Sequence, residues 1–414
     1  MLWTRKLPPI HDRSRVVGID LTASRARAVS VGGGKVRPLP LDDAADDLAL
    51  YLACDRRTPE AGRAGVALAR KAPHSVVSNF LAGIGQPGEF RAGRHVLTPE
   101  AALELVAAKF REPVAAESDA AALVLPPYLA AYQVARVVAV AARVKLPLKG
   151  SAAAPLAVAA HRAAAVLDGK PAPAADAPAG DVLKMRPPAG GPAAVVVVDA
   201  DDFALTTAVV AVDRDAVRLG AVGCWPRVGV RVWKDRLLDA LADRCVRLCR
   251  RDPRDSADAE QGMYDQLDDA LDRARAGQRV SLSVRTAHWF QDLIQSPEEF
   301  DANCAALAAA AAEAVWELVA GAGLRVPPRV VWLTHAAGRL PGLARLIHQN
   351  APEGIAVEVL PAGAVAHAAA ALVPRWLAND LPRAHLDSVI ALERVAAPAG
   401  RVPGEKPGTA RGAT

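Results

Sequence analysis

The sequence predicts an α/β protein built from two similar halves, each with a mixed sheet flanked by helices. Apolar segments at 16–20 and 194–199 each end in an aspartate and are followed by two further strand-like segments, a pattern typical of an antiparallel meander. After each meander, helical periodicity alternates with short apolar strands, which favours mixed sheets covered by helices on both faces. We therefore expect a cleft between the two halves.

In the N-terminal half, three glycines at 32–34 predict the second turn of the meander. Thr98-Pro99-Glu100 predicts a helix start, because threonine caps helices and proline fits their first turn. The expected elements, in order, are strands at 16–20, 25–31 and 35–39, a helix from 98, a strand at 121–125, a helix from about 129, a strand near 145–148 and a helix through 162.

In the C-terminal half, Ser296-Pro297-Glu298-Glu299 forms a capping box that predicts the start of a long alanine-rich helix. The expected elements, in order, are strands at 194–199, 204–212 and 216–222, a helix at 235–248, the helix from 296, a strand at 329–333 and a helix from about 341.

Composition shifts predict where the domains begin and end. Residues 169–192 are rich in proline, alanine and glycine, which is typical of an exposed connector. We expect, in order, an N-terminal extension at 1–15, a first lobe at 16–168 with a smaller subdomain at 39–97, the connector, a second lobe at 193–378 with a helical subdomain at 250–290, and a flexible tail at 379–414.

Charge and hydropathy exclude several classes of protein. The net charge of +5 is spread along the chain without interleaved aromatic residues, so nucleic-acid binding is not indicated. No apolar run reaches the roughly 18 residues of a membrane span, and residues 1–13 lack the apolar stretch of a secretory signal. We therefore expect a cytoplasmic protein with no membrane association.

The five cysteines argue against a disulfide framework. Cys245 and Cys249 are one helical turn apart and could act as soft metal ligands if other ligands converged on them. None stands nearby in sequence, so we interpret the pair as two small apolar residues on one helix face.

The order of motifs resembles the heat-shock protein 70 (DnaK-type) family, within the actin-like ATPase superfamily, over nearly all of residues 16–376. GIDLTAS at 18–24 resembles the first phosphate loop of that family, and VVDADD at 197–202 lies where the second should be. VVWLTHAAGRLP at 330–341 is similar to the adenosine motif. Three further segments carry the resemblance: VLPPY at 124–128, the stretch 145–159, and Leu219-Gly220.

This resemblance implies duplicated RNase H-like lobes, each with a mixed five-stranded sheet, around a cleft that holds ATP or ADP. The residues it implies at the nucleotide are Asp20, Thr22, Ser24, Asp199, Asp201, Asp202, Gly338 and Arg339. Asp20 and Asp199 are the candidates for a catalytic role. The family's peptide-binding domain has no counterpart in this sequence, so a protein client or partner would have to engage the lobes themselves.

The second phosphate-loop segment departs from the family pattern at two glycines, which are Asp201 and Asp202 here, and Thr22 replaces a glycine in the first. Side chains obstruct the backbone approach that phosphate needs, and carboxylates repel it. We expect weak ATP binding. Together with Asp20 and Asp199, the two acids offer hard oxygen ligands for Mg²⁺ or Ca²⁺. The alternative interpretation is that Asp201 and Asp202 are solvated turn residues.

Other catalytic groups of the family have no equivalent. Its lysine falls near Leu81 and its glutamate near Gly150, so we expect a pseudo-ATPase that has lost hydrolysis. His335-Ala336 replaces a glycine pair and would crowd the base. Arg339 stands where the family stacks an arginine on adenine, although a surface arginine at a helix start is an equal interpretation.

Three functions follow from these observations. The first is a nucleotide-binding protein like heat-shock protein 70, with the family's role in ATP binding and chaperone-type protein folding, in which ATP hydrolysis has been lost. The second is a non-catalytic scaffold or regulator that uses the actin-like fold to bind a partner, since a fold does not determine a function. The third is a relative of sugar or acetate kinases.

Overall fold

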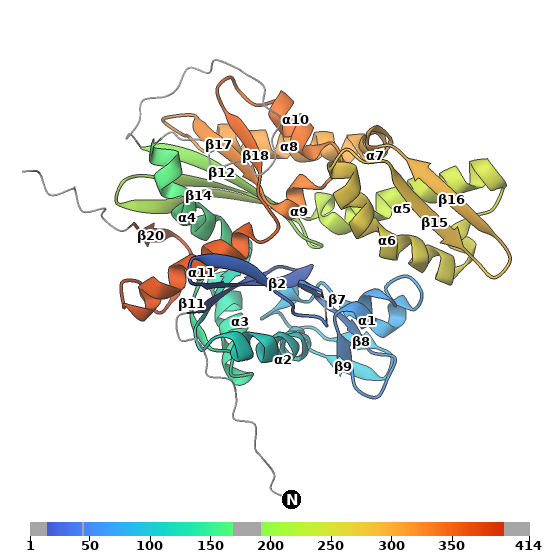
Figure 1. Cartoon of the computed structure of the whole chain (residues 1–414), viewed down its shortest axis with the longest axis horizontal. Helices are drawn as coiled ribbons and strands as arrows, with labels where there is room; N and C mark the ends of the chain where they lie inside the picture. Colours follow the sequence, from blue (N-terminus) through green and yellow to red (C-terminus); the bar gives the residue numbers. More distant parts are fainter. Residues whose placement is uncertain (1–14, 44, 169–191, 393–414) are drawn as a thin grey trace, which may run out of the picture.

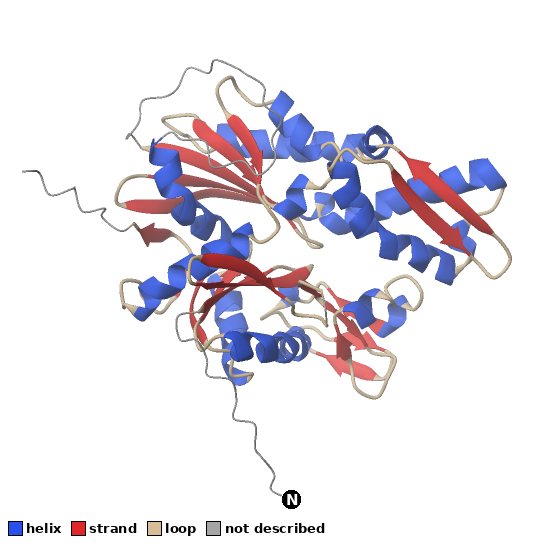
Figure 2. Ribbon diagram, viewed as in Figure 1, coloured by secondary structure: helices blue, strands red, loops and turns tan. Residues whose placement is uncertain are grey.

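Two large mixed sheets dominate the architecture (Figures 1 and 2). The structure is a computed structural model that describes residues 15–43, 45–168 and 192–392. The predicted extension and connector lie outside the described residues, apart from residues 15 and 192, and so does the tail from residue 393.

The first sheet has the order β19-β11-β10-β1-β2-β3, with β4 also paired to β2. β1 pairs antiparallel with β2 and parallel with β10, which in turn is parallel to β11. The strands are β1 Val16–Leu21, β2 Arg25–Gly32, β3 Lys35–Leu39, β4 Asp47–Ala49, β10 Ala121–Leu125, β11 Leu148–Ala153 and β19 His385–Leu386.

The second sheet repeats this pattern in the order β18-β17-β12-β13-β14-β20. β12 pairs antiparallel with β13 and parallel with β17, and β17 is parallel to β18. The strands are β12 Ala193–Ala200, β13 Leu205–Val212, β14 Ala216–Trp225, β17 Pro328–Leu333, β18 Ala356–Val359 and β20 Val389–Ala391. Both predicted meanders are therefore confirmed.

Two helices cross between the sheets and join the halves. α4 (Ala154–Asp168) follows β11 of the first sheet but packs on β12, β13 and β14 of the second. α11 (Ala364–Leu377) follows β18 of the second sheet but packs on β1, β2, β10 and β11 of the first. The two helices also pack on each other, and one apolar core draws residues from both sheets. The halves are therefore joined by a shared core.

The other helices belong to one half each. In the N-terminal half, α2 (Pro99–Glu117) and α3 (Ala131–Arg143) pack together, and Thr98 caps α2 as predicted, its Oγ1 accepting from the amide of Ala101 at 3.2 Å. The C-terminal half carries α5 Val230–Cys249, α6 Ala257–Arg275, α7 Pro297–Asn303, α8 Ala305–Gly321, α9 His335–Gly338 and α10 Leu343–Gln349. Together with the strands, these helices make a mixed α/β fold.

The smaller elements of residues 39–97 are short and mostly extended. They are β4, β5 Tyr51–Ala53, β6 Glu60–Ala61, α1 Arg63–Val66, β7 Val76–Ser78, β8 Phe90–Ala92, β9 His95–Leu97 and the 3-10 turns Pro73–Ser75 and Leu81–Gly83. Two further 3-10 turns, Pro226–Val228 and Pro253–Asp255, flank α5.

The structure corrects several predicted boundaries. The predicted strand near 145–148 is β11, which begins at Leu148. The long helix predicted from 296 breaks at Cys304 into α7 and α8, with a bend of 72°. Residues 250–290 hold α6 but also β15 (Val280–Arg285) and the first residue of β16 (Phe290–Gln295). The hairpin of β15 and β16 packs on α6 and α5.

The tail is ordered further than predicted. Within the stretch predicted to be flexible, β19 pairs with β11 of the first sheet and β20 with β14 of the second, so a single short segment adds a strand to both sheets. This addition raises the strand number of each sheet above the predicted five.

Within the described residues, no single helix is long and apolar enough to cross a membrane. The bent pair of α7 and α8 meets the criteria of length and composition only when its two parts are taken together.

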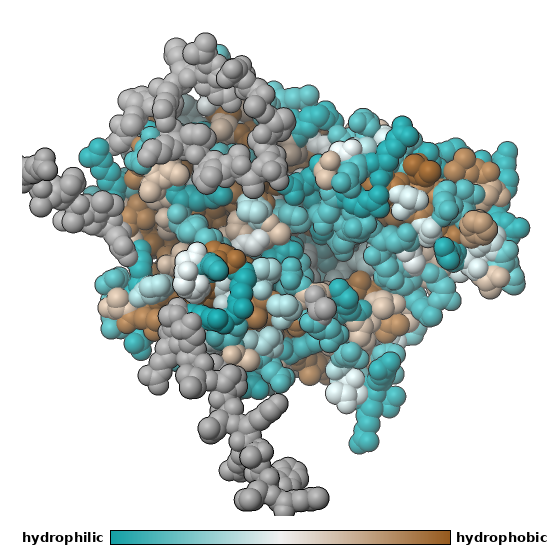
Figure 3. All heavy atoms as spheres, in the orientation of Figure 1, coloured by the Kyte–Doolittle hydropathy of each residue, from teal (hydrophilic) through white to brown (hydrophobic). Residues whose placement is uncertain are grey.

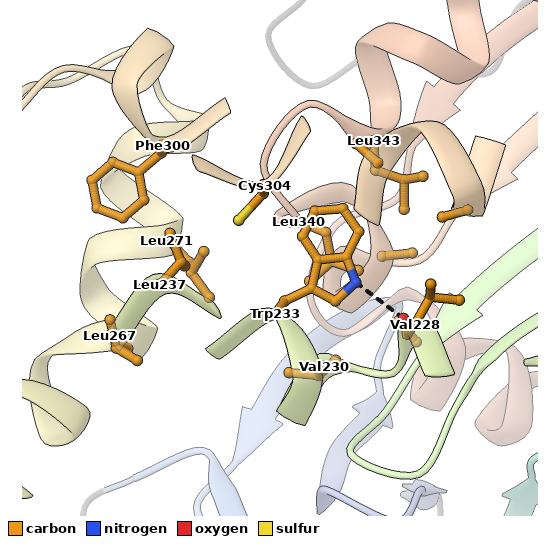
Figure 4. Packing of buried hydrophobic residues seen from close by; sticks show 14 of the residues in the cluster. Val228, Val230, Trp233, Leu237, Leu267, Leu271, Phe300, Cys304, Leu340 and Leu343 are labelled. Atoms are coloured by element: carbon orange, nitrogen blue, oxygen red, sulfur yellow. Dashed lines mark hydrogen bonds between the residues drawn. The ribbon is translucent and has the colours of Figure 1, made fainter. Parts of the chain in front are cut away.

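Trp233 organises the core of the C-terminal half (Figure 4). Its indole N–H donates to the carbonyl of Val228 at 3.0 Å, and the ring is fully buried. Leu340 and Leu343 from the chain after β17 belong to the same apolar cluster. Trp233 thereby fixes the start of α5 against the turn that follows β14.

The contact between β1 and α11 requires a residue without a side chain. A Cβ on Gly18 would lie 1.9 Å from the carbonyl oxygen of Ala366 and 2.4 Å from the amide nitrogen of Ala370. Both atoms belong to the α11 backbone, so neither can yield by a side-chain rotation. Gly18 therefore sets how closely the helix from the C-terminal half approaches the first sheet.

We predict that Gly18→Ala lowers the free energy of unfolding by about 3 kcal/mol or more, because overpacking here must displace backbone. Chemical denaturation measures the change. The matched control is Gly88→Ala, since a Cβ there would meet no atom within 4 Å. Equal stability of the two variants would contradict the close β1–α11 contact.

Candidate functional site

The two segments that resemble phosphate loops contact each other directly. The turn after β12 presents Asp201, whose Oδ2 accepts from the backbone amide of Ala23 at 2.9 Å and from the hydroxyl of Tyr128 at 2.7 Å. Its Oδ1 accepts from the amides of Phe203 and Ala204 in its own turn, at 3.0 and 2.9 Å. One carboxylate therefore shapes its own turn and bonds the two halves together.

Asp202 adds a second set of contacts between the halves. Its carboxylate accepts from the hydroxyls of Ser24 at 2.9 Å and Tyr51 at 2.7 Å, and its amide donates to Ser24 Oγ at 2.7 Å. Tyr51 also lies 3.3 Å from the hydroxyl of Tyr264. The expectation that Asp201 and Asp202 are solvated turn residues is wrong, since they are only 3% and 9% exposed.

Burial governs the electrostatics of Asp201. Burial raises its pKa to about 6, while the amides of Ala23 and Ala204 and the hydroxyl of Tyr128 act to lower it. The four donors therefore offset the cost of placing a carboxylate in the interior.

Asp20 and Asp199 lie at the ends of β1 and β12 and are coupled electrostatically. Burial raises the pKa of Asp20 to about 7; Arg25 opposes the rise, and the charge of Asp199 adds to it. The nearest cationic group to Asp20 is the Arg25 guanidinium, at 4.0 Å. Asp199 accepts from Thr334 Oγ1 at 2.5 Å, and burial raises its pKa as well.

The predicted Mg²⁺ or Ca²⁺ site gains no support from this arrangement. The part of the chain that the structure describes contains no group of three or more histidine, cysteine, aspartate or glutamate residues that could hold a metal ion. Oxygens of Asp201 and Asp202 that would serve as ligands already accept hydrogen bonds from the protein, and so does one oxygen of Asp199. Asp20 faces Arg25 instead.

Thr22 serves its own turn. The Oγ1 atom accepts from the amide of Arg25 at 3.3 Å and donates to the carbonyl of Arg25 at 3.2 Å, and the side chain is buried. Of the three predicted residues in this segment, only Ser24 bonds to the C-terminal half, whereas Asp20 faces Arg25 and the Thr22 side chain closes the turn itself.

A cavity of about 560 Å³ remains between the two halves. In Figure 3, the hollow between them is bordered largely by hydrophilic residues. Its wall on α6 presents Asp268, which bonds Lys234 Nζ at 2.8 Å and Arg339 Nη2 at 2.6 Å. Burial raises the pKa of Asp268, but Lys234 and Arg339 outweigh burial and hold that pKa well below its usual range.

His335 and Arg339 lie at the same wall, after β17. Burial and the nearby charges of Arg339, Arg27 and Arg25 together lower the pKa of His335 to about 3, so the ring is neutral at pH 7. The guanidinium of Arg339 also lies 3.7 Å from Asp272, and the side chain as a whole is 13% exposed, so the surface-arginine interpretation is wrong. Asp268 and Asp272 therefore hold Arg339 in place in the structure.

Gly338 and Gly150 have packing roles. A Cβ on Gly338 would lie 2.2 Å from Val359 Cγ1, so this glycine lets α9 pack on β18, and it does not line the cavity between the halves. A Cβ on Gly150 would overlap the Trp376 ring at 2.2 Å. The space beside Gly150, where the resemblance would place a glutamate side chain, is therefore filled by the Trp376 ring, and Leu81 is fully buried in the core of the N-terminal half.

Sequence reasoning missed the residues that complete this site. Tyr128 stands in the VLPPY segment after β10, where its place after a buried strand was a usable signal. Tyr51, Lys234 and Asp268 carry no such signal, because each comes from a different element and only the tertiary fold brings them together.

No model of a known protein family matches the chain, and no curated protein matches its sequence.

We predict that Asp201→Ala lowers the free energy of unfolding by roughly 2–4 kcal/mol, because it leaves several buried donors without an acceptor. The loss should be smaller for Asp201→Asn, which keeps one acceptor oxygen. Asp269→Ala is the control, since the side chain of Asp269 is 77% exposed. Denaturation curves that coincide for Asp201→Ala and Asp269→Ala would contradict the bridging role.

The raised pKa of Asp20 predicts a pH dependence of stability. Because the folded pKa of about 7 exceeds the ordinary 3.8, the stabilising neutral form is complete below about pH 4 and is lost as pH rises through 7. Asp20→Asn should remove this loss, worth on the order of a few kcal/mol. Urea denaturation between pH 5 and 8.5 measures it. A variant whose pH dependence matches that of the wild type would contradict this assignment.

Proposed function

We propose that this protein is a non-catalytic scaffold or regulator with the fold of the actin-like ATPases, in which its own carboxylates fill the place of the nucleotide phosphates. The observation that carries the proposal is the bond from the Ala23 amide to Asp201. Backbone amides of such a turn are the donors that would receive a phosphate oxygen, and a buried carboxylate already occupies one of them.

The topology supports the fold assignment. Two sheets with the same order and strand directions, joined by α4 and α11 that each cross to the opposite sheet, match what the resemblance to the heat-shock protein 70 family implies. The five central strands of each sheet would correspond to one RNase H-like lobe. β19 and β20 would then be additions of this chain.

Electrostatics disfavours a triphosphate at the two turns. Asp201 and Asp202 are buried there, and an anion about 4 Å from a carboxylate is repelled by on the order of 4 kcal/mol at an effective dielectric near 20. Displacing either carboxylate would also strand the hydroxyls of Tyr128 or Tyr51. Both effects oppose nucleotide binding in this conformation.

Several contacts between the halves favour a function that does not depend on their opening and closing. Arg27 of β2 bonds both oxygens of Asp47 and also the carbonyl of Ala362 ahead of α11, the last at 2.6 Å. The segment that holds β19 and β20 adds backbone pairing to both sheets. A cycle of opening and closing would have to break these contacts together.

A second candidate is the nucleotide-binding, chaperone-type function of the heat-shock protein 70 family. The cavity of about 560 Å³ favours it, because its size suits a small ligand and Arg339, Lys234 and Tyr264 line it. Nothing in the geometry favours a sugar or acetate kinase.

We predict that ATP or ADP with Mg²⁺, at up to about 5 mM, leaves the thermal midpoint of the wild type unchanged, because a ligand stabilises only the state that it binds. The double variant Asp201→Gly, Asp202→Gly should bind ATP more tightly than the wild type, since it frees the Ala23 amide and removes two negative charges. Asp269→Asn, which removes an exposed charge outside the cavity, is the control.

A clear upward shift for the wild type would favour the second candidate. Steady phosphate release that Asp199→Ala abolishes would overturn the proposed loss of catalysis.

A further inference from the structure

The N-terminal half carries a second cavity on its outer side, a groove of about 820 Å³ between α2, β9 and the chain after α3. These elements lie together in Figure 1, on the side of the N-terminal half that faces away from the second sheet. The lining of the groove is mainly apolar, with Pro59, Leu97, Ala101, Leu105, Ala108 and Val144. None of the residues that line it belongs to the site between the halves.

One face of α2 forms the length of this groove. Ala101, Leu105, Ala108 and Arg111 follow one another at helical spacing on that face, while Leu103, Val106 and Phe110 point into the core. From Ala101 to Arg111 the helix rises about 15 Å, which is two to three turns. The small side chains of Ala101 and Ala108 on either side of Leu105 permit close approach of another backbone.

The rim of the groove is cationic. Arg111 and Lys145 form no ion pair with any described residue, and Arg143 bonds Glu104 at 2.9 Å. Glu104 is the only acidic residue among the described residues that line the groove, against three cations. The groove therefore combines an apolar floor with an excess of positive charge.

We infer that this groove binds a short acidic amphipathic helix of a partner protein. The apolar face of that helix would lie on Leu105 and Val144, and its carboxylates would meet Arg111 and Lys145. The length and the concave apolar floor suit a helix laid in a groove. The described lining has no phenylalanine, tyrosine or tryptophan on which successive bases could stack, and its one imidazole, His95, is engaged with the carbonyl of Arg56, which disfavours single-stranded nucleic acid.

This inference rests on the proposed scaffold function, because it names a surface through which a scaffold would bind its partner. It is tested independently of the nucleotide site. Binding of the helix at the groove would support the inference even if the wild type also binds ATP. Binding of ATP would contradict only the proposed loss of nucleotide binding.

The test uses two fluorescein-labelled helical peptides of about 14 residues, with leucines at helical spacing and either glutamate or lysine at the other positions. Fluorescence anisotropy with the full chain should show binding of the glutamate peptide and at least about tenfold weaker binding of the lysine peptide. Adding salt should weaken the glutamate complex, because exposed charges are screened.

Two variants locate the binding. Arg111→Glu with Lys145→Glu should weaken the glutamate peptide at least about tenfold, and Ala108→Trp should do so by blocking the floor. Arg247→Glu is the matched control, since Arg247 is an exposed arginine on α5 without an ion pair to any described residue. Thermal midpoints and circular dichroism show whether each variant is folded.

A dissociation constant above about 100 μM for the glutamate peptide and the wild type would overturn the inference. So would an equal loss of affinity for this peptide in Arg247→Glu and in the groove variants. So would binding of a single-stranded oligonucleotide or of vesicles containing phosphatidylserine that the groove variants abolish while the glutamate peptide stays unbound.

Discussion

The carboxylate of Asp201 is the contact on which the arrangement of the two halves depends. It is buried, and its four donors come from both sides of the interface. A carboxylate taken out of water must find such partners, so the turn after β12 and the turn after β1 can close on each other only in one register. Asp202, Ser24 and Tyr51 then complete the same interface.

A second contact between the halves is formed by the two helices that cross between the sheets. α4 and α11 exchange sheets and pack in a shared core, and Gly18 allows α11 to approach β1 at backbone distance. The turns after β1 and β12 form one set of contacts between the halves, and the two crossed helices form another. The two halves are therefore joined by their own side chains and by a shared core.

Local patterns predicted much of the fold. The two meanders and the Thr98 cap depend on residues close in sequence, and their periodicity and turn chemistry are legible there. β19 and β20 were missed because two and three residues carry almost no periodicity, and their stability comes from pairing with distant strands. The break at Cys304 was missed for a related reason, since alanine-rich sequence favours a continuous helix and only packing decides where it bends.

The sequence predicted where the candidate site lies but not what its side chains contact. Asp201 and Asp202 do bond the turn after β1, and Asp20 and Asp199 are coupled through their charges, yet the partners of these residues could not be read from the sequence. A pair of aspartates after a strand is usually solvated, and here Tyr51, Tyr128 and the Ala23 amide come from elements that lie far away in the chain. Gly150 shows the same limit, since only the fold reveals the Trp376 ring beside it.

Hydrogen exchange at the Ala23 amide tests the central claim most directly. In the protein without any added ligand, the bond to Asp201 should keep this amide protected to a degree similar to that of the β1 amides, and Asp201→Ala should release it selectively. Exchange of the wild-type Ala23 amide at the rate of an open loop would show that the two turns do not bond each other, and would contradict the account.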